Sequence, residues 1–395
     1  MDTEEKLRQL AAGADYDIAA PSTGGRRGAP AEPGICRVAG RDGGALLRVL
    51  MSDRCEHDCS FCPLRASAPR RRSAFAPSEL ATLFTRMHTA GRVDGLFLSS
   101  AVDGSPDAAM ERMLDTVEIL RSRDGFDGYV HLKLLPGASD AVVEAAARLA
   151  NRVSINVEVP TGAYLQRLGT GKDMLRDILR PMHRLRAMEQ AGHLPSGIST
   201  QYVVGAAGES DREIVSSVRW LNEEIGLRRA YFGLFRPAPD TPLQDQAAAH
   251  HLRPARLYQV DWLTRVYGLP HDEVGAAFDG QGNLPLGVDP KVSMALARPD
   301  SPLVEINKAS YEELLRVPGI GPVAAQRIVG LRGGHSFADI SQLKRAGVAV
   351  NRAAPFILIN GRRPADAAVQ RAQLAKKRAA APAAYGVQLT LPGFE

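Results

Sequence analysis

The chain has 395 residues, of which 45% are hydrophobic and 24% are charged, and its formal net charge is +5. This composition supports an ordinary buried core and excludes an intrinsically disordered protein, while the length allows one large domain and one smaller one. No run approaches the roughly 20 apolar residues that a membrane-spanning helix requires, so we expect no membrane partner.

The first 40 residues show no hydrophobic periodicity. The stretch PSTGGRRGAPAEPG is rich in glycine and proline, so residues 1–40 are expected to form a flexible leader. The opening residues, MDTEEKLRQLAAGADYD, are acidic and lack the apolar region of a secretory signal. We therefore expect a cytoplasmic protein.

Residues 41–236 alternate between short apolar runs and helical patterns. The runs suit buried parallel strands joined by right-handed βαβ crossovers. Six such units are fewer than the eight of a closed TIM barrel, so we expect an α/β fold with a partial (βα)6 TIM-like barrel. The expected strands are Leu46–Met51, Gly95–Ser99, Tyr129–Leu134, Val153–Val159, Ile198–Val204 and Ala230–Phe235. The expected helices between them are Pro77–Gly91, Asp107–Arg121, Ser139–Leu149, Asp173–Gly192 and Ser210–Ile225.

Three of the four cysteines follow the first expected strand, in the sequence CEHDCSFC. The Cys-x3-Cys-x2-Cys spacing of Cys55, Cys59 and Cys62 brings three thiolates onto one short loop, which favours a metal site over packing. One interpretation is a [4Fe–4S] cluster with an open fourth iron. The other is zinc completed by Cys36 or His57, since structural zinc prefers four protein ligands.

This spacing, with Phe61 just before the third cysteine, resembles the signature of the radical S-adenosylmethionine (SAM) superfamily. The resemblance implies that Cys55, Cys59 and Cys62 ligate a [4Fe–4S] cluster, with Phe61 beside the cofactor. It also implies that SAM chelates the open iron and that Cys36 is not a ligand. Reductive cleavage of SAM would yield a 5′-deoxyadenosyl radical that abstracts a substrate hydrogen. The electron would come from a donor such as flavodoxin or ferredoxin.

Polar residues and a glycine at other strand ends are candidates for SAM contacts by the same resemblance. Ser99 and Ser100 stand where the family commonly has a Gly-Gly-Glu-like segment, which contacts the methionyl amino group. Asn156 and Glu158 lie in an apolar strand, where polar side chains are costly unless they face a polar cavity; partners inside the barrel are the alternative. Gly205 lies in a segment similar to the one beside adenine.

Four further basic residues are considered for the expected site. Lys133, in the third strand, could face the cavity. Arg70, Arg71 and Arg72 follow the cysteines, either as a solvated loop or as an attraction for a phosphate-bearing substrate.

The pattern changes after the sixth strand. Residues 237–300 are expected to form a connecting or capping subdomain, with helices near Pro254–Tyr267 and Asp272–Ala277. Residues 301–362 are expected to form a small all-α domain. In it, helices Ser310–Arg316 and Val323–Arg332 flank the hairpin PGIGP.

This second module resembles the helix-hairpin-helix of DNA-binding proteins. Gly319 and Gly321 would let backbone N–H groups meet a DNA phosphate, and Arg327 would add charge. Such binding reads the backbone rather than the bases. A degenerate second copy follows, with Gly347 at its turn. The alternative is a protein–protein adaptor.

Residues 363–395 are expected to form a linker and a C-terminal docking peptide. The segment Gln388–Pro392, QLTLP, resembles the motif by which bacterial repair and replication proteins bind the DNA sliding clamp. A tail that folds back on its own domain is the alternative.

The two modules together resemble DNA modification or repair radical SAM proteins. We therefore expect an enzyme that abstracts hydrogen from a nucleotide in DNA, with the target base flipped or single-stranded. The alternatives are a radical SAM enzyme that acts on RNA or on a protein-bound substrate, and a non-catalytic DNA-binding iron–sulfur protein.

Overall fold

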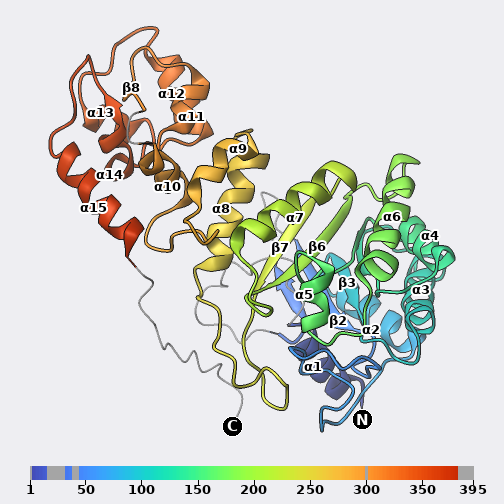
Figure 1. The fold of residues 1–395 in the computed structure, drawn as a ribbon. Coiled ribbons are helices and arrows are strands. Elements are labelled where there is room, and N and C mark those ends of the chain that lie inside the picture. Colours follow the sequence, from blue (N-terminus) through green and yellow to red (C-terminus); the bar gives the residue numbers. More distant parts are fainter. Residues whose placement is uncertain (1, 16–31, 38–43, 299–300, 381–395) are drawn as a thin grey trace. The chain divides into compact units, whose positions relative to one another are not determined.

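The computed structural model describes residues 2–15, 32–37, 44–298 and 301–380 (Figure 1). The chain divides into two compact units. The first comprises the described residues up to Glu209 and residues 216–249, and the second comprises residues 210–215 and the described residues from His250 onward. Among the described helices, none combines the length and the apolar character that crossing a membrane needs.

The first unit is built on a seven-stranded sheet whose strands follow one another in chain order. Strands β2 to β7 are all parallel, and β1 pairs antiparallel with β2 at the edge. The curled sheet confirms the predicted partial (βα)6 TIM-like barrel. The strands are β1 (Ile35–Arg37), β2 (Ala45–Leu50), β3 (Gly95–Ser99), β4 (Tyr129–Lys133), β5 (Arg152–Ser154), β6 (Ile198–Val204) and β7 (Arg229–Leu234).

Helices connect the parallel strands, as the alternating pattern predicted. The crossover helix α3 shows why they begin where they do: the Ser105 side chain accepts a hydrogen bond from the Ala108 N–H, and Pro106 fills the first position. The helices of this part are α1 (Thr3–Ala14), α2 (Pro77–Thr89), α3 (Pro106–Ser122), α4 (Asp140–Leu149), α5 (Gly162–Arg167), a π-helix (Met174–Leu179), α6 (Arg180–Gln190) and α7 (Asp211–Glu224). The first residues of α7 cluster with the second unit.

Residues 3–14 differ from the expected flexible leader, because they form the helix α1. Asp2 caps this helix through a 2.7 Å bond from the Glu5 N–H. Leu7, Leu10 and Ala14 are buried, and the helix packs against β2. The spacing of these apolar residues is that of a helix with one buried face.

The fourth expected strand is shorter than the apolar run Val153–Val159 predicted. After β5 the Thr200 hydroxyl enters the ladder, where it donates to the Ile155 carbonyl (2.7 Å) and accepts from the Val157 N–H (3.1 Å). Pairing resumes at Glu158, which bridges to Tyr202 with a φ of 64°. A left-handed conformation costs a non-glycine residue about 1 kcal/mol, so strain lies at a predicted site residue.

The second unit contains short helices around a separate core. Leu314, Ile320, Ile328, Leu343 and Ile357 are all buried in it. Its elements are α8 (Arg253–Arg265), α9 (His271–Val274), a 3-10 turn (Gly275–Ala277), α10 (Pro290–Ala297), β8 (Val304–Glu305), α11 (Tyr311–Arg316), α12 (Pro322–Leu331), α13 (Ile340–Arg345), α14 (Val350–Ala353), a second 3-10 turn (Ala354–Phe356), β9 (Ile357–Leu358) and α15 (Ala367–Ala379).

The expected connecting or capping subdomain, residues 237–300, does not form a separate body. Residues from 250 onward cluster with the hairpin helices, whereas residues 237–249 cluster with the barrel. Helix α10 explains part of this, since Val292 and Ser293 are buried within the second unit.

The two hairpins of the second unit contact each other through Gly319. Its φ is 82°, and a Cβ atom at this position would lie 2.5 Å from the Ala349 carbonyl oxygen. The Gly319 carbonyl in turn accepts from the Ala349 N–H at 2.9 Å. Gly319 is therefore needed for the packing of one hairpin on the other, a role distinct from the predicted phosphate contact.

We expect Gly319→Ala to destabilise the second unit by about 2 kcal/mol or more, since it adds both a backbone clash and φ strain. Thermal unfolding followed by calorimetry measures this as a lowered midpoint. Gly330→Ala is the matched control, because nothing lies within 4 Å of a Cβ there and alanine favours a helix by about 0.5–1 kcal/mol. Equal melting of the Gly319→Ala and wild-type proteins would contradict the packing role.

Candidate metal centre and nucleic-acid interface

The three neighbouring cysteines lie on a long loop, residues 53–73, here called the cysteine loop. It follows β2 at the carboxyl end of the sheet, where active sites of α/β barrels gather. Backbone bonds close its base: Asp53 N–H donates to the Ser73 carbonyl (3.1 Å), and Phe75 N–H donates to the Met51 carbonyl (2.9 Å). The ends of the loop are therefore held together like neighbouring strands.

Arg72 binds the cysteine loop from within. Its two terminal nitrogens donate to five backbone carbonyl groups, four of which follow Cys62 in the chain. The acceptors are the carbonyl oxygens of Asp53 (2.6 Å), Leu64 (2.8 Å), Arg65 (2.5 Å), Ala66 (3.4 Å) and Ala68 (3.4 Å). A planar guanidinium can satisfy several acceptors at once, which an ammonium group cannot do in the same geometry.

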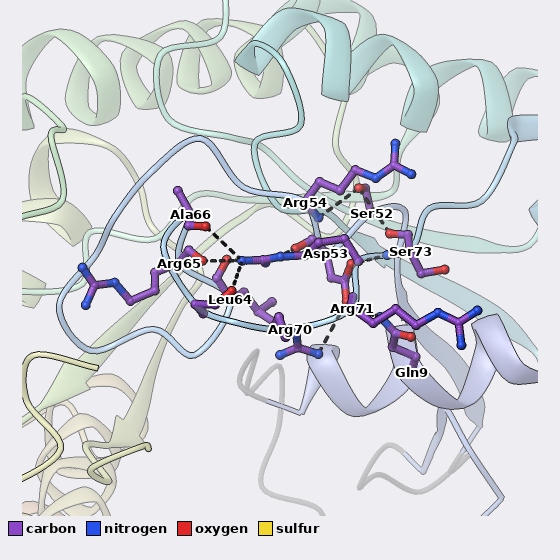
Figure 2. A network of polar contacts seen from close by, with 12 residues as sticks. Gln9, Ser52, Asp53, Arg54, Leu64, Arg65, Ala66, Arg70, Arg71 and Ser73 are labelled. Carbon is purple, nitrogen blue, oxygen red and sulfur yellow. Dashed lines mark hydrogen bonds and ion pairs between the residues drawn. The ribbon is translucent and has the colours of Figure 1, made fainter. Parts of the chain in front are cut away.

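Asp53, which is completely buried, links this loop to helix α1 (Figure 2). One carboxylate oxygen accepts from the Ser73 N–H at 2.6 Å, and the other accepts from the Gln9 side chain at 2.7 Å. Gln9 also donates to the Arg71 carbonyl at 2.8 Å. The N-terminal helix therefore contributes directly to the shape of the cysteine loop.

The arginine triplet is engaged within the protein. Arg70 pairs with Asp53 at 3.5 Å and Arg71 pairs with Glu5 at 3.3 Å, while Arg72 binds the loop carbonyls. The sequence allowed two interpretations of this triplet, a solvated loop or an attraction for a phosphate. Arg72 fits neither, because it is bonded to the backbone of the cysteine loop.

The three thiols are close enough to influence one another. Burial, with a smaller contribution from Cys59, raises the pKa of the Cys62 thiol to about 12. Burial also raises the pKa of Cys59; the Lys172 charge opposes this shift, and Glu158 and Cys55 add to it. Such thiols would ionise at neutral pH only beside a bound cation, so ligation of a metal cluster would have to remove their protons.

Within the described ranges, no three or more His, Cys, Asp or Glu side chains have the arrangement of a metal site. Ligation of the cluster by Cys55, Cys59 and Cys62 stays a prediction.

Cys36 lies at the opposite end of the sheet from the cysteine loop. It is on β1, opposite Leu46 near the start of β2, whereas the loop follows the last residue of that strand, Leu50. Four residues of strand separate the two ends by about 13 Å. This placement agrees with the expectation that Cys36 is not a ligand.

Lys172 was not predicted, and it connects the thiols to the polar residues of the barrel. Its ammonium pairs with Glu158 at 3.5 Å, and both side chains are about nine-tenths buried. Although burial lowers the pKa of Lys172, the negative charges of an ionised Cys59 and of Glu158 raise it on balance. Asn156 donates to the other oxygen of Glu158 at 3.3 Å. The structure thus brings Asn156 and Glu158 together, near Cys59.

The signal for Lys172 in the sequence is the segment Gly169–Lys172, GTGK. Gly169 and Gly171 both have positive φ angles, 57° and 67°. They place the chain against the cysteine loop, where Ser60 N–H donates to the Leu168 carbonyl at 2.9 Å. Two glycines around one residue mark a sharp turn, but nothing local indicates what that turn contacts.

Lys133 lies at the end of β4. Burial lowers its pKa to about 8, although Glu158 opposes the shift. This coupling places its ammonium in the same electrostatic environment as Glu158 and Lys172.

The remaining candidates for SAM contacts lie on different elements of the first unit. Ser99 is buried at the end of β3, where its carbonyl accepts from the Met51 N–H at 2.7 Å, and the Ser100 hydroxyl donates to the Ala101 carbonyl at 2.8 Å. Gly205 follows β6 with a φ of 91°, and its N–H donates to the Glu209 carboxylate. Phe61 is half-buried in the cysteine loop. Their contacts with SAM stay predictions.

The predicted nucleic-acid interface lies around the first hairpin. Gly321 is the N-cap of α12 and offers no side-chain acceptor to the first N–H groups of that helix. Arg327 is exposed, and its Nη1 lies 3.3 Å from where a Cβ of Gly347 would be, so it reaches the second hairpin. Arg332, at the end of the same helix, donates to the Ile306 carbonyl at 3.1 Å, within the protein. The segment Gln388–Pro392 lies outside the described residues.

Two family models match the chain. Residues 49–221 match the model described as the radical SAM superfamily, and residues 300–353 match that of a helix-hairpin-helix motif. Both matches agree with the two resemblances on which the sequence-based predictions rest.

Several solved structures are similar to part of the chain at low identity. HydG, a maturase of the [FeFe]-hydrogenase, has a TM-score of 0.45 at 11% identity over 55% of this chain. Methylornithine synthase (PylB) has a TM-score of 0.44 at 16% identity over 54% of this chain. A radical SAM methyltransferase from Sphaerobacter thermophilus has a TM-score of 0.43 at 16% identity, over 60% of this chain and 67% of its own. The chain spans 49% of HydG and 60% of PylB.

Proposed function

We propose that the chain is a radical SAM enzyme, because residues 49–221 match the model of that superfamily. In this proposal Cys55, Cys59 and Cys62 hold a [4Fe–4S] cluster at which SAM is cleaved reductively. When bound, the cluster and SAM supply the electron and the deoxyadenosyl group for hydrogen abstraction. The observation that carries the proposal is the Cys-x3-Cys-x2-Cys loop at the carboxyl end of β2, which lies within the residues that match the radical SAM model.

Residues around this loop have supporting roles in the proposal. Lys172 offsets the negative charge of ionised thiols, because its buried ammonium is coupled to Cys59. Asn156 and Glu158 present an amide and a carboxylate to SAM from the end of the barrel. Arg72 holds the loop in shape through its carbonyl contacts.

We propose that the substrate is a nucleotide in DNA and that the reaction belongs to DNA repair or modification. The support is the helix-hairpin-helix match at residues 300–353 in the same chain, together with the uncapped start of α12 and the exposed Arg327. Backbone N–H groups at a helix start bind phosphate without reading sequence. The target nucleotide would have to leave its stack to reach the barrel, by flipping or in a single strand.

Two partners belong to the same proposal. An electron donor such as flavodoxin or ferredoxin would reduce the cluster, because radical SAM chemistry needs a reductant. The DNA sliding clamp would bind Gln388–Pro392. This partner is proposed from the sequence motif alone.

The test is anaerobic turnover of the reconstituted protein with dithionite, SAM and DNA that contains deuterated nucleosides. We expect release of 5′-deoxyadenosine that carries deuterium, and a changed nucleoside in the digested DNA, both by mass spectrometry. Release of 5′-deoxyadenosine without deuterium transfer from DNA, but with transfer from RNA or from a protein-bound substrate, would assign the substrate to that alternative. If no 5′-deoxyadenosine forms, the protein is not a SAM-cleaving enzyme.

A further inference from the structure

A buried lysine lies directly behind the hairpin that is proposed to bind DNA. Lys291, on α10, is 7% exposed, and its Nζ donates to the Ile320 carbonyl at 2.5 Å. The Ile320 carbonyl and the Gly321 N–H belong to the same peptide unit. Among the described residues, the Gly321 N–H has no acceptor.

The Lys291 ammonium is surrounded by a tyrosine ring and by an aspartate that is paired with another residue. Its Nζ lies 4.8 Å from the centre of the Tyr267 ring, and the Tyr267 hydroxyl lies 3.1 Å from where a Cβ of Gly321 would be. Asp289 caps α10 and pairs with Arg352 at 3.5 Å. Arg256 also interacts with Asp289, and Arg378 of α15 donates to the Ser293 hydroxyl of α10 at 2.8 Å.

We propose that Lys291 is a positioning residue for DNA binding, which polarises the Ile320–Gly321 peptide so that the Gly321 N–H donates more strongly to a DNA phosphate. The physical basis is that a hydrogen bond accepted by a carbonyl strengthens the bond donated from the same peptide unit. A charged donor gives the largest effect. This inference rests on the proposed function of the hairpin.

The same geometry makes DNA binding depend on pH. Burial lowers the pKa of Lys291 to about 7, although Asp289 opposes the shift. A bound phosphate favours the protonated form, so by linkage the affinity falls as pH rises through this value. Stability changes in the opposite direction: the unfolded chain binds more protons between pH 7 and 10.5, so folding is favoured as pH rises.

The experiment measures fluorescence anisotropy of a labelled DNA duplex and a labelled single strand with the full-length protein, at pH 6 and 8.5 and over a salt series. For Lys291→Met we expect affinity at pH 6 to fall about three- to tenfold, as for one charge-assisted bond acting through a peptide. The wild type should lose a similar factor between pH 6 and 8.5, whereas Lys291→Met should not respond to pH. The salt slope should be unchanged in this variant, because Lys291 touches no phosphate.

Arg327→Ala is the control for a direct phosphate contact, since it should weaken binding and reduce the salt slope by about one. Lys291→Gln is a second neutral variant and should behave like Lys291→Met. Both are expected to fold, because each removes a buried charge.

Wild-type affinity in both neutral variants at pH 6, together with weakened binding by Arg327→Ala, would overturn the role of Lys291 and leave the proposed function standing. Absence of salt-dependent DNA binding by the wild type would overturn the DNA substrate itself, and the inference with it.

Discussion

Replacing Cys59 by alanine is expected to abolish both iron–sulfur assembly and SAM cleavage. Cys59 is the middle thiol of the loop and is buried beside Lys172 and Glu158. A cluster bound by three thiolates loses a third of its protein ligands with this change. We expect iron and labile sulfide to fall to background after anaerobic reconstitution, and 5′-deoxyadenosine to fall to the level of a protein-free control.

Cys36→Ala is the matched control for this prediction, because Cys36 lies at the opposite end of β2. Its iron content and SAM cleavage should equal those of the wild type. A loss of cluster in the Cys36 variant equal to that in the Cys59 variant would mean that Cys36 is a fourth ligand, which would favour a closed zinc-like site over an open cluster.

Replacing Arg72 by methionine is expected to release the cysteine loop even in the metal-free protein. Five carbonyl groups lose a charged donor, and a charged hydrogen bond contributes about 1.5–3 kcal/mol. We expect a loss of about 3 kcal/mol or more in the local stability of the loop. Limited trypsin digestion of the apo protein measures this as rapid cleavage after Arg65 or Arg70, and reconstitution should yield less iron.

Arg71→Met is the control for the Arg72 variant. Like the Arg72 variant, it removes one trypsin site from the loop. In the wild type, however, the Arg71 guanidinium is exposed and pairs with an exposed Glu5. Exposed pairs contribute about 0–1 kcal/mol, so digestion and iron content should match the wild type. Arg72→Met protein as resistant to trypsin as the control would show that other contacts hold the loop.

Local patterns were sufficient to predict most of the barrel. The strands Gly95–Ser99 and Ile198–Val204 agree with the structure at both ends, and the other expected strands begin within one residue of the observed ones. Each buried parallel strand is a short apolar run in its own sequence, and the helices between them carry their own caps. The cysteines were recognisable for the same reason, because their spacing is local.

Contacts between distant residues could not be predicted in this way. Lys172 reaches Glu158 and the thiols across a turn, Gln9 meets Asp53 from a helix 44 positions away, and Lys291 meets Ile320 across 29 positions. Thr200 shortens the neighbouring strand although nothing within Val153–Val159 signals it. Such pairs depend on which elements the fold brings together.

The amino-acid sequence by itself determined the local features of the protein. These are three thiols spaced for a cluster, six βα repeats that form a barrel, and a glycine-containing hairpin. The tertiary structure decided which residues support that chemistry, by turning Arg72 inward, docking α1 on the loop and placing Gly319 between two hairpins. The reason is physical. Spacing along the chain sets what a short segment can bind, whereas the burial and charge around each side chain are set by residues far from it in the chain.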